Sequence, residues 1–405
     1  MNVSEAAATT LARKAFLVRA LVAIVVHNFV TPGLFAPDEF TYDTGARHLA
    51  QFWRGESPVA PIFRGEGGGF YYIVAALYFP FGPIPLLPKL LNAWIGSLAV
   101  LELFRLTRLI GGSDTAALRA AKFMAYFPSM ILWSSLLIRD VWVQWLLVRL
   151  AREMAELKGR MIPSRMLSAG LLIWALTQFR SYLLYAAVGP FVLSFVVGRS
   201  KDIVRNLVLG SFLALGLTYF GTQSAGVGGK IQNFDLVEVQ RLRAWSSSTA
   251  VADSAFGSEA DVSTVEGALS FLPIGLAYFF LAPFPWQIGS IRQSLAIPET
   301  LFFYTLVPGI VAGILFLFRK RLVDSLGVLL VTMTVTFGYA IGQGNVGTLY
   351  RHKAQVTGFY YAFAAIGMEQ RRRRTAAQYP GHMIPPSRSL RPTPVETRAG
   401  RSALP

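Results

Sequence analysis

The chain has 405 residues, of which 53% are hydrophobic, 13% aromatic and only 15% charged, and apolar runs long enough to cross a bilayer recur along it. This composition excludes an ordinary soluble enzyme and indicates a polytopic membrane protein. The net charge of +16 does not point to nucleic acid, because Lys and Arg gather in loops that stay cytoplasmic, and the absence of cysteine excludes disulfides and thiolate chemistry.

The first hydrophobic run follows Arg13 and Lys14 and shows no small-residue cleavage site, so we expect an uncleaved anchor helix. Run length and flanking charge predict twelve apolar segments in all. They cover residues 15–34, 70–86, 89–106, 117–135, 136–151, 166–180, 182–198, 204–222, 267–282, 300–318, 324–342 and 354–368.

The distribution of basic residues selects a topology. If all twelve segments crossed, three basic clusters between residues 105 and 205 would face outward, against the positive-inside rule. Segments 70–86 and 267–282 are interrupted by prolines, which leave backbone groups that lipid cannot satisfy. With these two in the outer interface and ten crossings, the basic clusters and both termini become cytoplasmic. The predicted fold is an all-α bundle of about 10–12 hydrophobic helices.

The chain divides into few parts. Residues 1–370 are predicted to form the transmembrane domain, with a first outer loop at 35–69 and a long polar outer loop at 223–266. Residues 371–405 are rich in Arg, Pro and Ser, and we expect a disordered cytoplasmic tail that touches anionic lipid. In this topology the Asp38–Glu39 pair, the Arg139–Asp140 junction, the long loop and residues 342–353 share the outer face.

The stretch "APDEFTYDTGARHLAQFW" places two acids directly after the first span. Helical spacing predicts an amphipathic interfacial helix whose apolar stripe is Tyr42, Ala46, Leu49 and Trp53. Asp38 falls on the side of this stripe and Glu39 at its edge, and an acid aimed at an apolar boundary needs a partner or a task. The alternative is that both acids only complement the dipole of the first helical turn.

That stretch resembles the first outer loop of the multispanning glycosyltransferases that use lipid-phosphate sugars, the group of the protein O-mannosyltransferases, the aminoarabinose transferases and bacterial family 39. The resemblance continues through "LYFPFG", "LLNAWIGSLAVLELFRLTRLIGG" and "AAKFMAYFPSMILWSSLLIRDVWVQWLL", and resumes faintly at "GTLYRHKAQVTGFYYAFAAIG". It implies a GT-C fold, a bacterial inner-membrane location and a sugar donor on a polyprenyl phosphate.

By this resemblance Asp38 would be the catalytic base, Glu39 its neighbour and Asp140 the second acidic position. Transfer from a lipid phosphate also needs cations for the departing group. The cations expected on the outer face are Arg64, Arg139, Arg351, His352 and Lys353. For these cations the rival interpretation is interfacial snorkelling. For Asp140 it is a helix cap or a plain salt bridge.

The leading hypothesis is therefore a glycosyltransferase of cell-envelope polysaccharide biosynthesis that acts on a glycan, lipid or protein. A divalent metal at Asp38, Glu39 and Asp140 is conceivable but not required. One alternative is a polymerase or ligase of lipid-linked polysaccharide, in which Arg241 and Arg243 of the long loop would dominate. The others are a transporter or a non-catalytic assembly partner, the latter favoured by "RGEGGGF" at 64–70, where the family has a basic-Pro-Pro motif.

Overall fold

The computed structural model describes residues 3–61, 68–158, 160, 162–198, 235–250, 254–286 and 291–378, together with a few positions between 206 and 219. Its described helices are α1 (Val3–Phe29), α2 (Asp38–Trp53), α3 (Gly68–Phe81), α4 (Leu86–Leu109), α5 (Asp114–Tyr126), α6 (Pro128–Trp133), α7 (Asp140–Leu157), α8 (Pro163–Phe179), α9 (Leu183–Val197), α11 (Leu236–Ser248), α12 (Val265–Leu281), α13 (Ile291–Lys320), α14 (Leu322–Gly342) and α15 (Val346–Gln378). Among these residues the β pairing consists of one isolated bridge, so the predicted all-α fold is confirmed.

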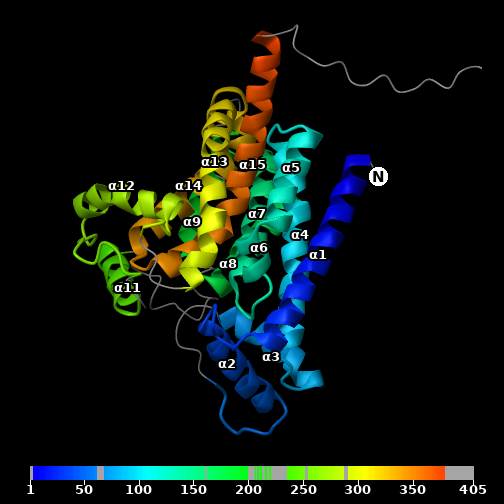
Figure 1. Cartoon of the computed structure of the whole chain (residues 1–405), viewed down its shortest axis with the longest axis vertical. Helices are drawn as coiled ribbons and strands as arrows, with labels where there is room; N and C mark the ends of the chain where they lie inside the picture. The colour runs from blue at the N-terminus through cyan, green and yellow to red at the C-terminus, as the bar shows by residue number, and fades with distance from the viewer. Residues whose placement is uncertain are drawn as a thin grey trace, which may run out of the picture.

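The helices form an elongated bundle in which α4, α7 and α15 pack through the centre and α1, α5 and α13 surround them (Figure 1). At one end of the bundle lie α2 and the start of α4, and α15 extends beyond the opposite end. The segment predicted at 117–135 is divided between α5 and α6. Phe127 takes an extended conformation before Pro128, whose ring disfavours a helical residue in front of it.

The packing of α13 against α15 depends on glycine. A Cβ added to Gly313 would collide with the carbonyl of Phe363, and one added to Gly367 would collide with the carbonyl of Gly309. Glycine at both crossing points lets the two backbones touch, as is common between helices in membranes.

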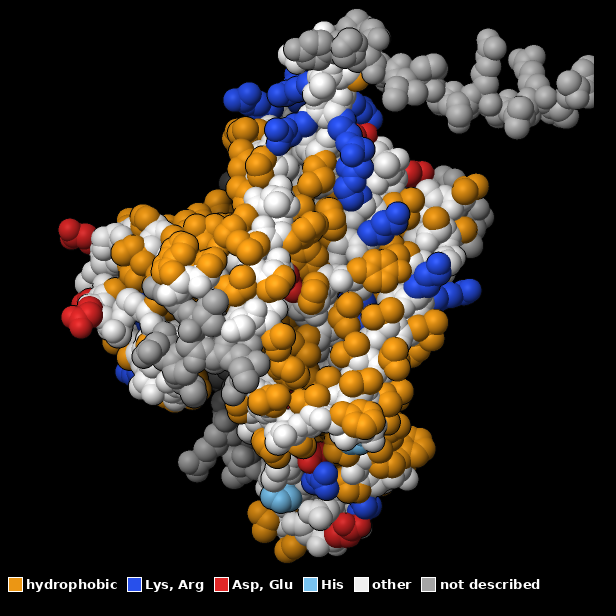
Figure 2. Space-filling view, viewed as in Figure 1, with side chains coloured by type: hydrophobic (Ala, Val, Ile, Leu, Met, Phe, Trp, Pro, Cys, Tyr) orange, Lys and Arg blue, Asp and Glu red, His pale blue; other side chains and the backbone are white. Residues whose placement is uncertain are grey.

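Hydrophobic side chains cover the middle of the bundle. Figure 2 shows them over most of the visible face, with Lys and Arg gathered where α15 ends. By length and composition, α4, residues 293–320 of α13, and α14 are apolar enough to cross a membrane, whereas α3, α9 and α12 are apolar but shorter. The predicted interfacial segments 70–86 and 267–282 correspond to the short helices α3 and α12. The number of crossings and the orientation stay predictions.

The tail differs from the expectation near its start. Residues 371–378 continue α15 as regular helix, so the basic run at 371–374 is helical and exposed rather than disordered. The remaining tail, 379–405, lies outside the described residues.

The long polar loop, where it is described, packs onto the end of α14 beside the start of α15. Phe256 N–H donates to the carbonyl of Gly344, and Val346 N–H donates to the carbonyl of Ser254. Arg243 is buried beneath this contact and donates to four carbonyl oxygens. These belong to Ile341, Gln343, Phe256 and Gly257. Arg243 therefore holds the loop in place.

The predicted first outer loop contains α2, the helix that its pattern predicts, and α2 packs on α3. Tyr42, Ala46 and Leu49 of the expected stripe are buried, and the Tyr42 ring meets Phe70 edge-on at 4.9 Å between centroids. Trp53 at the end of the stripe is 38% exposed. The stripe therefore faces protein along most of its length.

Candidate active site

Arg351, in the second turn of α15, joins the two acids that the sequence singled out. Its Nη1 donates to Oδ2 of Asp38 at 2.8 Å. Its Nε and Nη2 lie 2.7 and 2.6 Å from Oδ2 of Asp140. Residues 38, 140 and 351 thus meet at the α2 end of the bundle, although they are more than one hundred positions apart in the sequence.

Asp140 is the buried centre of this cluster, with 2% of its surface exposed. It is the first residue of α7, whose N-cap position is held by Arg139, so Asp140 is not itself the N-cap, and it forms ion pairs with Arg180 and Arg351. While Oδ2 accepts from Arg351, Oδ1 accepts from Nη2 of Arg180 at 3.1 Å and from Nε2 of Gln355 at 2.5 Å. Both oxygens are occupied, so Asp140 orients the surrounding cations.

Arg180 was missed by sequence reasoning. It lies in the break between α8 and α9, is 4% exposed, and donates to Asp140, to Nε2 of His352 at 2.8 Å and to the Tyr182 hydroxyl at 2.7 Å. Since a guanidinium only donates, Nε2 of His352 must accept, which makes that imidazole neutral with its proton on Nδ1. The only signal in the sequence is a lone arginine between two apolar segments, "TQFRSYLLY".

Tyr42 of α2 is buried and lies near the charged groups of the cluster. Burial raises the pKa of Tyr42 to about 12, against the opposing effect of the nearby Arg139 and Arg351 cations. Its hydroxyl therefore keeps its proton and can donate to an anion. The sequence predicts Tyr42 only as part of the apolar stripe of an interfacial helix, and the structure buries it near Arg139 and Arg351.

Glu39 and Asp38 are neighbours in the first turn of α2, but their side chains point in different directions. We expected Asp38 on the buried stripe and Glu39 at its edge, but Glu39 is buried and the Asp38 side chain is 51% exposed. Glu39 forms an ion pair with Lys89 of α4 at 3.0 Å, and the same Oε1 accepts the backbone N–H of Leu137 at 2.8 Å. Glu39 is thus a structural partner in this arrangement and does not sit beside Asp38 at the cluster.

The loop that leads into Asp140 is irregular and buried, so its backbone needs partners inside the protein. Asn92 of α4 supplies two of them, because its amide donates to the carbonyls of Leu136 and Ile138 at 2.7 and 2.8 Å. Its oxygen accepts from the indole of Trp142 at 2.8 Å. Asn92 and Glu39 together fix the position of Asp140.

Of the remaining expected cations, Arg139 and His352 lie close to the cluster and Lys353 turns away. Arg139 donates to the carbonyl of Phe179 at 2.6 Å and so ties the end of α8 to the start of α7. Arg64 lies outside the described residues.

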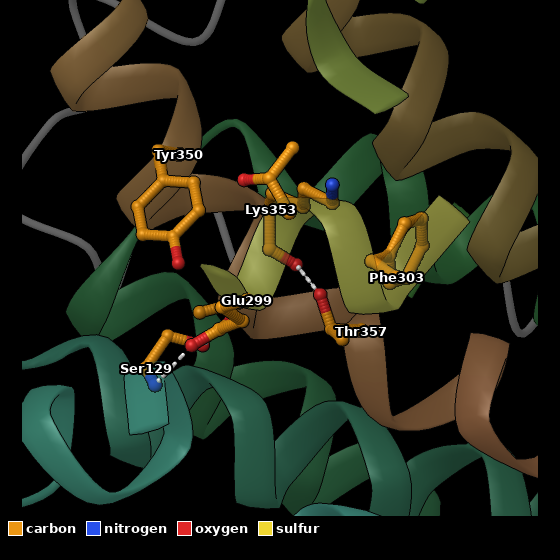
Figure 3. A pocket seen from close by; sticks show the side chains of 8 residues that line it. Ser129, Glu299, Phe303, Tyr350, Lys353 and Thr357 are labelled. Carbon is orange, nitrogen blue, oxygen red and sulfur yellow. Dashed lines mark hydrogen bonds between the residues drawn. The ribbon is translucent and has the colours of Figure 1, made fainter. Parts of the chain in front are cut away.

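Lys353 lines a small cavity away from Asp140, together with Ser129, Glu299 and Phe303 (Figure 3). Its Nζ donates to the carbonyl of Phe280 and lies 3.9 Å from the centre of the Phe303 ring. In the same cavity Glu299 accepts from the N–H and the hydroxyl of Ser129, at 2.6 and 2.5 Å. This cavity and the one beside Asp140 and Gln355 have volumes of about 10 Å³ each, room for roughly a single water molecule.

The described residues contain no group of three or more His, Asp or Glu placed to hold a metal ion. Asp38 and Asp140 share an arginine, and Glu39 is paired with Lys89. The three carboxylates considered for a metal are therefore not brought together.

The fold resembles that of a solved structure, the crystal structure of ArnT from Cupriavidus metallidurans bound to undecaprenyl phosphate. The TM-score is 0.54 and the sequence identity 16%, over 86% of this chain and 59% of that chain. ArnT is an aminoarabinose transferase of the GT-C type, and the likeness shows a GT-C-like membrane fold. This chain spans about 59% of the length of ArnT. No protein-family model matches the chain, and no match is found among curated proteins.

Proposed function

We propose that the chain is an integral-membrane glycosyltransferase that moves a sugar from a polyprenyl-phosphate donor to a glycan, lipid or protein acceptor at the outer face of the membrane. One observation carries the proposal. Arg351 bridges Asp38 of α2 and Asp140 of α7, at the end of a bundle whose fold resembles a transferase crystallised with undecaprenyl phosphate.

In the proposed reaction Asp38 accepts the proton of the acceptor O–H group. The acceptor oxygen forms its bond to the anomeric carbon while the bond from that carbon to the phosphate oxygen breaks. The phosphate leaves with the bonding electron pair and is stabilised by Arg351, whose planar guanidinium suits phosphate oxygens.

Asp140 has a positioning role in this scheme. It is buried and accepts from Arg351, Arg180 and Gln355, so it holds the guanidinium groups in fixed orientations before the donor arrives. Such preorganised charge needs no rearrangement during the reaction.

The rival proposal of a polymerase or ligase governed by Arg241 and Arg243 receives less support. Arg243 is buried, and its guanidinium donates hydrogen bonds to backbone carbonyl oxygens. Arg241 is largely exposed and forms an ion pair with Glu238 at 2.5 Å.

The test is glycosyl transfer by purified protein in lipid, supplied with polyprenyl-phosphate sugars, for the wild type, Asp38→Asn and Asp43→Asn. Asp43 lies on the same helix but pairs with Arg47 and accepts from the Tyr78 hydroxyl, so it is the matched control. We expect transfer to collapse in Asp38→Asn and to persist in Asp43→Asn. Equal transfer by all three proteins would show that Asp38 is not the base. If the wild type transferred no sugar from any donor to any acceptor, a non-catalytic or transport role would be favoured.

A further inference from the structure

The three members of the Asp38–Arg351–Asp140 chain are unequally exposed. Asp140 is 2% exposed, and the side chains of Arg351 and Asp38 are 12% and 51% exposed. The chain of contacts therefore runs from a buried carboxylate through a nearly buried guanidinium to a carboxylate at the surface.

Arg351 divides its guanidinium between the two acids. Nε and Nη2 face Asp140, and Nη1 faces Asp38. The edge held by Asp140 fixes the plane of the group and leaves the Nη1 corner pointing toward the exposed side. An anion that approaches from outside meets this corner first, and Asp38 already occupies it.

We propose that the Asp38–Arg351 ion pair masks the base until the donor binds: a lipid phosphate that takes the Nη1 corner of Arg351 displaces Asp38 and frees its carboxylate for the acceptor. This inference deepens the proposed function and rests on it for the catalytic consequence. The exchange itself breaks and forms only ion pairs.

Two physical arguments favour the exchange. An ion pair with a half-exposed partner contributes little net free energy, because water competes for the carboxylate, so Asp38 is the easier partner to displace. A phosphate also offers more oxygens than one carboxylate, and it replaces the negative charge that Asp38 withdraws, which leaves Arg351 and Arg180 compensated.

The exchange imposes an order on the reaction. An acceptor that arrives first meets a carboxylate whose Oδ2 is already held at 2.8 Å by Arg351. Only in the donor complex is the carboxylate of Asp38 released from its ion pair with Arg351. Asp38 is thus a catalytic residue whose availability depends on the donor phosphate.

The first experiment measures the affinity of undecaprenyl phosphate, without sugar, for purified protein in nanodiscs of neutral lipid. If Asp38 competes for Arg351, Asp38→Asn should bind this lipid more tightly than the wild type, by about threefold or more. The control Asp43→Asn removes the same charge from the same helix and should bind as the wild type does, while Arg351→Gln should bind more weakly. An affinity in Asp38→Asn that equals or falls below that of the wild type would overturn the proposal, as would equal tightening in Asp43→Asn.

The second experiment follows Asp38 in the unmodified protein. Carbodiimide-driven amine labelling, located by mass spectrometry, should increase at Asp38 when undecaprenyl phosphate is added and stay constant at Asp43. Unchanged or decreased labelling of Asp38 would contradict the exchange. Neither experiment requires glycosyl transfer. Loss of transfer in Asp38→Asn without tighter lipid binding would refute the proposed exchange alone. Tighter lipid binding in a protein that never transfers a sugar would refute the proposed function alone.

Discussion

Nζ of Lys89 lies 3.0 Å from Oε1 of Glu39, and the two side chains are only 7% and 8% exposed. The same carboxylate oxygen accepts the backbone N–H of Leu137. This pair therefore connects α2, which carries Asp38, to α4 and to the loop that ends at Asp140. The positions of Asp38 and Asp140 relative to each other therefore depend on the Glu39–Lys89 contact, in which neither of them takes part.

Glu39→Gln should destabilise the protein by about 3–5 kcal/mol, because it leaves the Lys89 ammonium buried without a counter-charge. Thermal unfolding in detergent measures the effect. The double variant Glu39→Gln with Lys89→Met should regain most of the loss, since it removes the orphaned charge. A Glu39→Gln protein as stable as the wild type but without transfer would show instead that Glu39 takes part in the chemistry.

Asn92→Ala should lower stability by about 1–3 kcal/mol for each buried carbonyl that loses its donor, those of Leu136 and Ile138. Transfer should fall with it, because the loop no longer fixes Asp140. Asn28→Ala is the matched control, since Asn28 is exposed and donates only to the carbonyl one turn earlier. Equal unfolding temperatures for the two variants would contradict the assigned role of Asn92.

Arg180→Lys should reduce transfer about 10²–10³-fold, since one ammonium cannot reproduce the geometry of a guanidinium that contacts Asp140, His352 and Tyr182 together. Initial rates at saturating donor give the measurement. The exposed Arg241→Lys serves as control and should be silent. If Arg180→Lys transferred at the wild-type rate, Arg180 would be only a buried structural cation.

Gly367→Ala should disrupt the contact between α13 and α15, because its new methyl group would collide with the carbonyl of Gly309. Gly338→Ala on α14 has open space and should be neutral or slightly stabilising. Circular dichroism melts of the two variants compare them directly. Melting of Gly367→Ala at the wild-type temperature would mean that the two helices separate without cost.

The helices and the pairing of distant acids were accessible from the sequence, for identifiable reasons. Apolar runs and flanking charges predict the bundle, and the position of Asp38 and Asp140 beside the ends of such runs predicts that they share one end of it. Arg351 was found because it lies just before the last predicted apolar segment, 354–368. Each of these signals is local and depends only on hydrophobic length and charge.

The inversion of Asp38 and Glu39 was not accessible, because helical periodicity gives the direction of each side chain without saying which partner it will meet. Lys89 and Leu137 decide that Glu39 is the buried member, and both are far from it in the sequence. Arg180 was missed for a similar reason, since a single arginine in an apolar context resembles a snorkelling residue. Lys353, two positions from Arg351, was grouped with it and faces a different cavity.

The small cavity beside Asp140 sets a condition for any substrate. Its volume of about 10 Å³ admits roughly a single water molecule, and the residues that line it include Asp140 and Gln355 but neither Asp38 nor Arg351. Room beside Asp140 is thus limited to water, and the half-exposed Asp38, whose contact with Arg351 joins α2 to α15, marks the side from which larger groups can approach. If a donor phosphate takes the place of Asp38 on Arg351, the same exchange removes the ion pair that connects α2 to α15, so α2 loses this attachment to the bundle as the donor binds.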